Sequence, residues 1–282
     1  MTKILKKELL LVSLLFGVFT MISNNFAEAK RNFTFDDAMK FESLRAPKIS
    51  NDGKWFAYEA SQDRGDITAS INSTEDTVKF RFANGRNITF SNNSEWAAMV
   101  ITPTQLENEN AKSAKDKPNN SLKIINLINK KDRDYEDLQK FVFSEDSKWL
   151  AFTIKNDESN KPKLEKFKEK KLGSNLVLHH LNSGTDITIN WVTEFVFDTN
   201  SRYIFYTVAE PKGKNDGVYC RDLTKEFAPE LLITNKENTY FSNLAWNKTS
   251  NILAFLSADL NEKGKPNDCS LILWNLDGTR NN

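Results

Sequence analysis

The chain has 282 residues, of which 39% are hydrophobic and 27% charged, and its formal net charge is +1 at pH 7. This balance leaves no excess of basic residues for nucleic acid or for an anionic membrane, so the sequence favours neither as a partner. The chain also contains no Cys-x-x-Cys, no His-x-x-x-His and no glycine-rich phosphate loop. We therefore predict no cofactor and no metal site.

The first 29 residues have the features of a secretory signal peptide. A start with three lysines precedes an apolar run from Leu9 to Ile22, and residues 27–29, Ala-Glu-Ala, fit the small-x-small cleavage rule. We expect cleavage after Ala29 and export to the periplasm or the cell exterior, with no membrane contact afterwards. The alternative is an uncleaved anchor, although the run is short for a span of about 20 residues. Cleavage removes three of 39 basic and two of 38 acidic residues, which leaves 36 of each.

Residues 30–45 form a lead-in segment before the repeats. It contains the sequence FTFDDAMKF, in which Thr34 can cap a short helix. Asp36 and Asp37 then lie in the first turn, where carboxylates suit the positive end of a helix. Pro47 ends this approach, and we place the start of the repeated domain at residue 46.

One hairpin motif occurs five times, and its clearest copy is FVFSEDSKWLAFTI. Alternating apolar residues lead into a turn of short polar side chains, and an almost continuously apolar strand follows. The copies begin at Pro47, Ile88, Phe141, Phe195 and Leu244. In this copy the large Trp149 precedes the small Ala151 by two positions, and similar pairs recur at the same offset, which predicts a layered, interlocking core. Only the first turn has a glycine, Gly53, at the position suited to a positive φ.

A second, weaker motif lies between the hairpins. It is a strand, an Asn-Leu or Asp-Leu corner and polar turn residues, or a close variant of these, and its copies begin at Ser121, Asn175, Gly217 and Ser270. Two hairpins per repeat make four antiparallel strands in ~40–50 residues, which is the period of a propeller blade. Blades must stack, because one blade cannot bury both of its faces. We predict an all-β fold, a β-propeller of four-stranded antiparallel blades over residues 46–282, with about five blades in an incomplete ring. The alternative is a β-sandwich with chance similarity between strands.

Two repeats are expected to be irregular. The segment from Gln62 to Thr77 is polar, which predicts that the first blade lacks a good third strand. The last repeat reaches Asn282 with no clear fourth strand.

Four polar loops occupy the same place in the later repeats, after the first hairpin and before the second. They are Pro103–Asn120, Asn156–Ser174, Glu210–Asp216 and Asp259–Asp268. Equivalent loops emerge on one face of a propeller, and insertions gathered there often mark the functional face. They are equally compatible with solvated loops of no special role. The stretch from Lys161 to Lys171, with six lysines and two glutamates, is expected to be a solvated surface.

The residues that could carry catalysis are few. No Gly-x-Ser-x-Gly occurs, so there is no nucleophile elbow. His179 and His180 are adjacent on one predicted strand and point to opposite faces, so they cannot act together on one ligand. Cys220 and Cys269 could form a bridge between neighbouring blades, but their positions within the repeat differ, which favours two free thiols. We assign no catalytic, cofactor-binding or metal-binding residue.

The sequence FTFDDAMKFESLRAPKISNDGKWFAYEASQDRGD, together with FVFSEDSKWLAFTI and NLVLHHLNSGTDI, resembles the amino-terminal β-propeller of exported bacterial serine peptidases of the prolyl oligopeptidase family. The resemblance covers residues 33–282. It implies a propeller that gates peptide access to a carboxyl-terminal α/β-hydrolase domain, and no such domain lies within these 282 residues. The chain alone is then expected to be inactive.

The hairpin motif by itself is less specific, because it also resembles the repeats of TolB-like propellers. That resemblance implies a second function, a free-standing periplasmic propeller that binds a protein or peptide partner. The lead-in followed by the first hairpin is the part that favours the peptidase family.

Overall fold

In the computed structural model, the described residues are 32–63, 65–114, 116–156, 164, 167–225, 228–276 and 280–281. The predicted signal peptide lies outside them. The chain divides into two units, Met1–Phe41 and Glu42–Asn282. None of the helices in the described ranges is long and apolar enough to cross a membrane.

The first unit contains the short helix α2 (Phe35–Met39). Thr34 is its N-cap and Asp37 its third residue, and the two form a reciprocal capping box. The Oγ1 of Thr34 accepts the backbone N–H of Asp37 at 3.3 Å, and the Asp37 carboxylate accepts the N–H of Thr34 at 3.0 Å. The rings of Phe33 and Phe41 stack beside this helix with centroids 5.6 Å apart.

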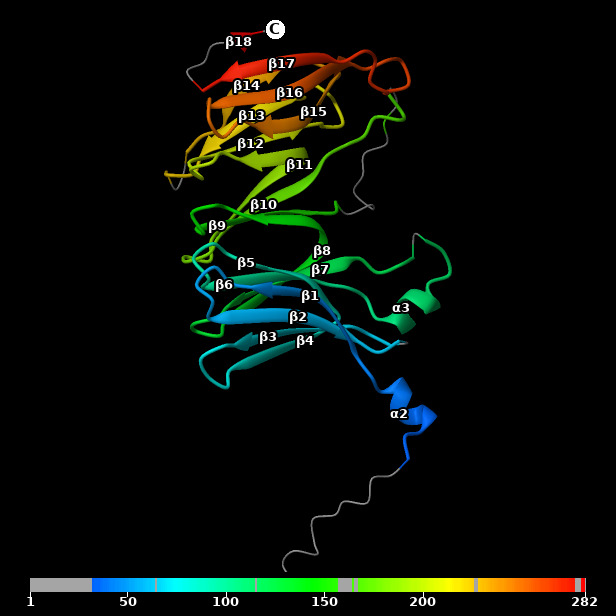
Figure 1. The fold of residues 1–282 in the computed structure, drawn as a ribbon. Helices are drawn as coiled ribbons and strands as arrows, with labels where there is room; N and C mark the ends of the chain where they lie inside the picture. Colours follow the sequence, from blue (N-terminus) through cyan, green and yellow to red (C-terminus); the bar gives the residue numbers. More distant parts are fainter. Residues whose placement is uncertain are drawn as a thin grey trace, which may run out of the picture. The chain divides into compact units, whose positions relative to one another are not determined.

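The second unit is all-β and consists of five four-stranded antiparallel blades (Figure 1). Blade 1 comprises β1 (Ser43–Ile49), β2 (Trp55–Ser61), β3 (Thr68–Ser73) and β4 (Lys79–Ala83). Blade 2 begins with β5 (Gly85–Phe90), β6 (Trp96–Ile101) and β7 (Asn120–Asn126), and the helix α3 (Gln105–Asn110) precedes β7. Blade 3 has β9 (Trp149–Ile154) and β10 (Ser174–His180) at its centre. Blade 4 ends with β12 (Tyr203–Val208), β13 (Gly217–Asp222) and β14 (Leu231–Asn235). Blade 5 is β15 (Thr239–Trp246), β16 (Ile252–Asp259), β17 (Ser270–Asn275) and β18 (Arg280–Asn281).

Two long strands pass from one blade to the next. The first half of β8 (Asp132–Phe143) pairs with β7 as the outer strand of blade 2, and its second half pairs with β9 as the inner strand of blade 3. The strand β11 (Asp186–Phe197) joins blades 3 and 4 in the same way. These shared strands merge three blades into one ten-stranded sheet. The strand pairing therefore confirms the predicted fold class, a β-propeller of four-stranded antiparallel blades.

The two repeats expected to be irregular have all four strands. In blade 1, β3 lies inside the polar segment, and its Ala69 and Ile71 are fully buried. Sequence reasoning missed this strand because its other face carries serine, threonine and asparagine, which hide the alternation. In blade 5, β18 pairs with β17 as a fourth strand of two residues. The expectation that this repeat lacks a fourth strand was therefore wrong.

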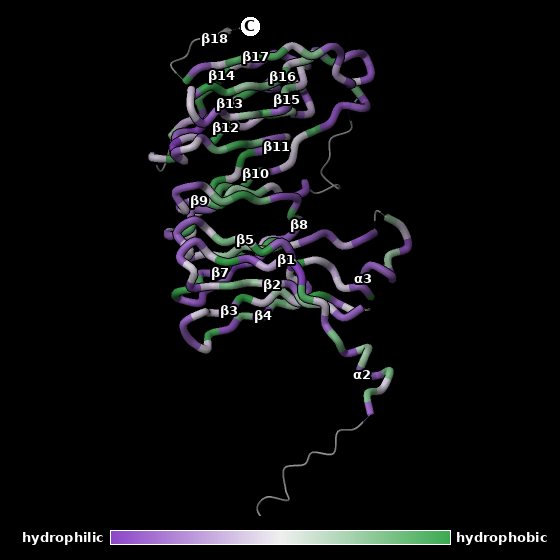
Figure 2. The backbone as a smooth tube through the Cα atoms, viewed as in Figure 1, coloured by the Kyte–Doolittle hydropathy of each residue, from purple (hydrophilic) through white to green (hydrophobic). Residues whose placement is uncertain are grey.

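The core lies between successive blades rather than inside any one of them. In each of the four interfaces, residues of one blade that alternate along the second and third strands pack on the next blade. Between blades 3 and 4, for example, Trp149 and Ala151 belong to the same buried cluster as Ile204 and Tyr206. Hydrophobic residues follow the strands in Figure 2, and hydrophilic residues occupy most of the connections.

The blades have two rims. We call the ends that carry the turn between first and second strands the turn rim, residues 50–54, 91–95, 144–148, 198–202 and 247–251. The opposite ends form the loop rim, with the connections between second and third strands, which are the described residues among 62–67, 102–119, 155–173, 209–216 and 260–269.

Successive turns on the turn rim are linked by hydrogen bonds, which we call the serine ladder. The bonds are Asp52 N–H to Ser94 Oγ at 3.2 Å, Asn93 N–H to Ser147 Oγ at 3.0 Å and Asp146 N–H to Ser201 Oγ at 3.1 Å. All three serines are buried and have positive φ, between 54° and 62°. A glycine would fit that backbone better but has no hydroxyl to accept the bond. The first turn has Gly53 at this position, and no earlier turn among the described residues donates to it.

Candidate functional site

The loops of blades 3, 4 and 5 interlock on the loop rim. The backbone N–H of Glu169, in the blade 3 loop, donates to the carbonyl of Lys263 in the blade 5 loop at 2.8 Å. Gly264 has a φ of +92°, and a Cβ there would lie 2.7 Å from the backbone nitrogen of Lys170 and 2.8 Å from the carbonyl of Phe167. The long insertion of blade 3 therefore reaches blade 5 and packs on it backbone to backbone.

A buried ion pair lies at the centre of this interlocked group. Lys170 Nζ is 2.5 Å from Asp216 Oδ2, and both side chains are almost completely buried. The same Nζ donates to the carbonyl of Glu210 at 2.7 Å, and the backbone N–H of Glu210 donates to Asp216 Oδ1 at 2.9 Å. Burial raises the pKa of Asp216, and the Lys170 ammonium opposes that rise. The pair is therefore enclosed by the blade 4 loop and has several partners.

A glycine makes room for this pair. Gly213 has a φ of +71°, and a Cβ there would collide with the side chain of Asn238 and lie 3.2 Å from Lys170 Nζ. Asn238 in turn donates its N–H to the Gly213 carbonyl at 3.2 Å. Lys170 thus contradicts the expectation that the lysine-rich stretch is wholly a solvated surface. Lys168 and Lys171 nearby are exposed, as expected.

A polar cavity of about 490 Å³ lies between the loops of blades 1 and 2 on the same rim. Its lining comes from residues 65–67, Asn84, Arg86, 102–103, Gln105, Asn108, 117–118 and Asn120. Asp66 is already engaged, because its Oδ1 accepts the backbone N–H of Gln105 at 2.7 Å. Neither Arg86 nor Lys117 has an ion pair or a side-chain hydrogen bond among the described residues. The cavity therefore offers two free cations and several amide groups, a set that suits a carboxylate or another hydrogen-bonding anion.

A second cavity, of about 260 Å³, is mainly apolar and lies against the inner strands of blades 3 to 5. Phe195, Trp246 and Val142 contribute to its walls, and Lys248 and Glu145 also line it. Neither cavity is lined by a serine, a cysteine or a histidine, so neither brings a nucleophile together with a base.

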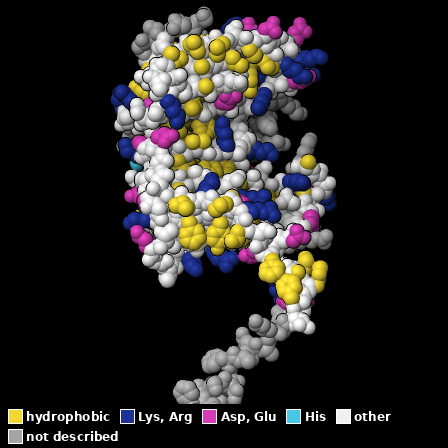
Figure 3. All heavy atoms as spheres, viewed as in Figure 1, with side chains coloured by type: hydrophobic (Ala, Val, Ile, Leu, Met, Phe, Trp, Pro, Cys, Tyr) yellow, Lys and Arg dark blue, Asp and Glu magenta, His cyan; other side chains and the backbone are white. Residues whose placement is uncertain are grey.

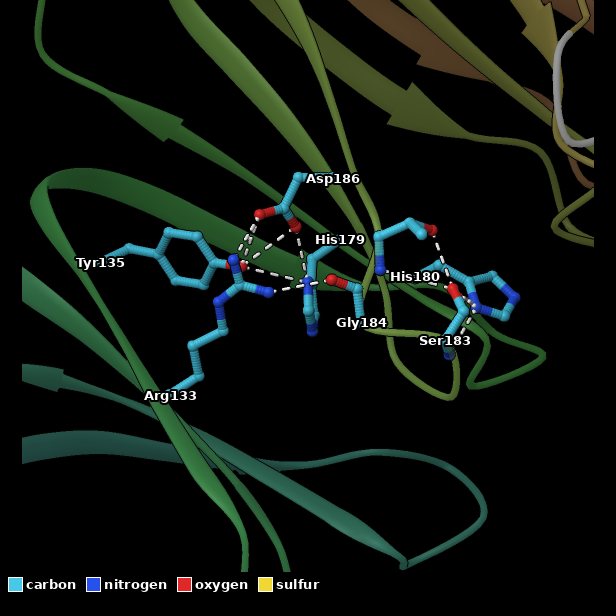
Figure 4. Close-up of polar contacts among 8 residues, drawn as sticks. Arg133, Tyr135, His179, His180, Ser183, Gly184 and Asp186 are labelled. Atoms are coloured by element: carbon cyan, nitrogen blue, oxygen red, sulfur yellow. Dashed lines mark hydrogen bonds and ion pairs between the residues drawn. The ribbon is translucent and has the colours of Figure 1, made fainter.

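The two histidines occupy opposite faces of β10 and have separate partners (Figure 4). His179 is buried between blades 2 and 3, where its Nδ1 is 2.6 Å from Asp186 Oδ1. Because a carboxylate only accepts hydrogen bonds, this Nδ1 carries the proton. His180 differs, since its Nδ1 accepts the backbone N–H of Ser183 at 3.1 Å. The two rings do not share a ligand, as the sequence predicts.

Blade 2 contributes the rest of the cluster around His179. The hydroxyl of Tyr135 lies 3.0 Å from both oxygens of Asp186, and Arg133 contacts the same carboxylate at 2.9 Å. Arg133 also donates to the carbonyl of Gly184 at 2.9 Å and lies over the Tyr135 ring. Burial lowers the pKa of His179, although Asp186 opposes the change, and burial with the Asp186 charge raises the pKa of Tyr135. The cluster fastens two blades together at their outer strands.

The described residues contain no group of three or more histidine, cysteine or acidic side chains placed to hold a metal ion. Cys220 is a buried free thiol and Cys269 an exposed one, so the two do not pair. Burial raises the pKa of Cys220 to about 11, which makes it a poor nucleophile near neutral pH. We find no catalytic constellation in the described part of the chain.

No protein-family model matches the chain, and no curated protein is similar to it in sequence. Solved structures are similar in fold. Prolyl oligopeptidase B from Galerina marginata has a TM-score of 0.47 and 13% identity over 89% of this chain and 36% of its own. TolB from Acinetobacter baumannii has a TM-score of 0.37 and 12% identity over 85% of this chain and 53% of its own. A eukaryotic initiation factor has a TM-score of 0.49 and 15% identity over 85% of this chain and 54% of its own.

Peptidase and TolB structures are thus among the structural neighbours of this propeller. The chain spans about a third of the length of the peptidase just described. All three TM-scores are below 0.5, and the three identities are 15% or less. The assignment of the blades rests on the strand pairing of the chain itself.

Proposed function

We propose that this chain is the non-catalytic propeller portion of an exported serine peptidase of the prolyl oligopeptidase family. In this role it gates the access of peptides to a hydrolase domain outside these 282 residues. The observation that carries the proposal is the sequence of the lead-in and the first hairpin, which resembles that family and leads into regular four-stranded blades. Export follows from the predicted signal peptide, with cleavage after Ala29.

Contacts that fasten neighbouring blades together support a gating role. A cover excludes large substrates only if its parts do not separate easily. The serine ladder fastens blades 1 to 4 on one rim, and the interlocked loops with the Lys170–Asp216 pair fasten blades 3 to 5 on the other. The covering role needs no catalytic side chain from the propeller.

The proposal predicts that the purified 282-residue chain cleaves no peptide. Hydrolysis that survives comparison with a mock preparation from the same host would contradict it. The gating role itself is tested on the longer gene product that includes the hydrolase domain. That protein should cleave short peptides and spare folded proteins, and removal of residues 42–282 should abolish the size preference. A protein that digests large and small substrates alike with the propeller in place would disprove gating.

The second candidate is a free-standing periplasmic TolB-like propeller that binds a peptide or protein partner. The polar cavity with the free cations Arg86 and Lys117 favours it. A panel of fluorescent peptides with free or amidated carboxyl ends provides the test. The Arg86→Glu/Lys117→Glu variant should lose binding of the free acids. The Lys79→Glu/Arg81→Glu variant, which changes charge equally on the outer strand β4, should keep it. If both variants bind the free-acid peptides equally well, this cavity is not the peptide-binding site.

A further inference from the structure

The Lys170–Asp216 pair is distinguished by its enclosure. Lys170 Nζ donates to Asp216 Oδ2 at 2.5 Å, and the two side chains are 1% and 0% exposed. Lys236 Nζ and Asp259 Oδ1 are equally close, at 2.5 Å, but their side chains are 61% and 60% exposed. Figure 3 shows many lysine and arginine side chains on the surface of the molecule, where water solvates their charges. Almost none of the Lys170–Asp216 pair is open to solvent.

This enclosure makes the uncharged form of the pair accessible. Separated charges cost free energy in a protein interior, and the transfer of one proton removes both of them. Here the proton moves along an existing hydrogen bond, from Nζ of Lys170 to Oδ2 of Asp216. Burial raises the pKa of Asp216, and the charge of Glu210 adds to the rise, although the Lys170 ammonium opposes it. The transfer leaves a neutral amine beside a neutral carboxylic acid, and a desolvated neutral lysine is a nucleophile.

The other hydrogen bonds of the pair orient the amine toward the carboxyl carbon. Nζ also donates to the Glu210 carbonyl at 2.7 Å, so one of its N–H bonds is held away from the carboxyl group. The lone pair that the transfer creates replaces the N–H bond that pointed at Asp216. Oδ1 of Asp216 accepts the backbone N–H of Glu210 at 2.9 Å. That donor stabilises the negative charge that develops on Oδ1 when the nitrogen attacks.

We propose that Lys170 and Asp216 form an isopeptide bond, which joins the blade 3 loop covalently to the blade 4 loop. The lone pair of Nζ attacks Cγ of Asp216, a C–N bond forms, and Oδ1 takes up the electron pair of the carbonyl bond. The nitrogen then loses a proton, the Oδ2 hydroxyl gains one, and the Cγ–Oδ2 bond breaks as the carbonyl bond re-forms. Glu210, whose charge acts on Asp216, is a base placed to carry this proton. The ammonium and the carboxylate thus become one amide and one water, with no oxidation and no further reactant.

Proximity and enclosure favour the amide over the free groups. Well-oriented intramolecular reactions reach effective concentrations of about 10⁵–10⁸ M, which offsets the competition from hydrolysis. A closed site also limits the return of water once it has left. The bond removes two buried charges that are costly to desolvate. It would link two residues that are 46 positions apart in the sequence. The inference does not depend on the proposed function.

The mass of the intact protein tests the proposal. The folded wild-type chain should be lighter, by one water molecule, than the mass calculated for its sequence from the same amino terminus. Lys170→Met/Asp216→Leu leaves no buried charge, so it should fold, and it should have its full calculated mass. Lys236→Met/Asp259→Leu removes the exposed pair with the same separation and is the matched control. This control should retain the deficit of one water.

Peptide mapping locates the lost water. Asp216 precedes Gly217, and an Asp-Gly sequence can also lose water by closing to a succinimide. After tryptic digestion, tandem mass spectrometry should find a branched peptide that joins Lys170 to Asp216, with no cleavage after Lys170. Lys170→Met should then have its full mass, because the succinimide does not need the lysine.

Three results would overturn the proposal. A wild-type chain that keeps its full mass after prolonged incubation in the folded state has only an ion pair at this site. A deficit confined to the peptide that contains Asp216 and Gly217, and retained in Lys170→Met, is a succinimide. A deficit that persists in Lys170→Met/Asp216→Leu arises elsewhere in the chain.

Discussion

The two rims of the propeller are built on different principles. On the turn rim one short motif recurs, and the same kind of hydrogen bond joins three successive pairs of blades. On the loop rim every connection has its own length and sequence, and the contacts occur once each. The repeated rim distributes its stability over many small contacts. The loop rim has one buried ion pair, Lys170–Asp216, among the loops of blades 3 to 5, and a polar cavity between the loops of blades 1 and 2.

This comparison predicts that the largest single effect comes from the loop rim. Asp216→Ala leaves the Lys170 ammonium buried with only the Glu210 carbonyl as a close partner. Loss of one member of a buried pair costs about 3–5 kcal/mol, so the free energy of unfolding should fall by that amount. Denaturant unfolding measures it.

The matched control breaks an exposed ion pair between the same loops. Lys265 lies 2.9 Å from Glu169, and Lys265→Met should leave the unfolding midpoint unchanged because both side chains are largely solvated. The double variant Lys170→Met/Asp216→Leu should recover most of the loss, since no charge then remains buried. If Asp216→Ala unfolds at the same denaturant concentration as Lys265→Met, the stability of the loop rim does not depend on the Lys170–Asp216 pair.

On the turn rim the expected effect is smaller. Ser147→Ala removes the hydroxyl that accepts the Asn93 N–H, and a partly buried donor without its partner costs about 1–2 kcal/mol. Ser250→Ala in blade 5 is the control, because Ser250 occupies the same repeat position outside the ladder. Chemical denaturation should separate the two variants by more than the experimental error. Equal stability would show that the ladder contributes nothing measurable.

The first turn offers a converse test. Gly53→Ser gives blade 1 the side chain that blades 2 to 4 have, and a Cβ there meets no atom within 4 Å. The residue must still adopt a φ of +74°, which costs a residue with a Cβ about 1 kcal/mol. No described turn donates to position 53, so the variant should be slightly less stable than the wild type. A gain in stability would indicate a donor to this position that the ladder does not include.

The smallest expected effect is on the pH dependence of stability, and it comes from the cluster around His179 at the outer strands. Burial lowers the pKa of His179 below its ordinary value of about 6.5. The unfolded chain therefore takes up a proton at higher pH than the native one, and stability falls as the pH drops through that ordinary value. His179→Gln should flatten the fall in melting temperature on acidification, and His180→Gln should retain it. If the melting temperature of His179→Gln falls more steeply on acidification than that of the wild type, protonation of His179 stabilises the native state and this prediction is wrong.

The sequence predicts the turn rim much better than the loop rim. The repeat places the blades, because the same alternation and the same turn chemistry recur at a period that only stacked four-stranded sheets explain. It does not reveal the serine ladder, since the pattern does not say that Ser147 accepts a bond from another blade. The sequence did not predict the polar strand β3, because Ala69 and Ile71 are its only apolar residues.

The loop rim could not be predicted because its contacts join residues far apart in the sequence. Lys170 stands among lysines that are exposed, and only the fold brings it to Asp216, 46 positions later. Arg86 and Lys117 show no common pattern and meet at one cavity only because blades 1 and 2 are adjacent. The composition of a loop predicts whether a typical residue in it is exposed. It does not predict that one lysine, Lys170, is buried in an ion pair while its neighbours are exposed.

The most direct test of the proposed function is to sequence the gene beyond codon 282 in all reading frames. The peptidase proposal predicts further propeller strands, then a Gly-x-Ser-x-Gly motif with an Asp and a His after it. A firm stop codon followed by an unrelated gene would contradict that proposal and favour the free-standing propeller.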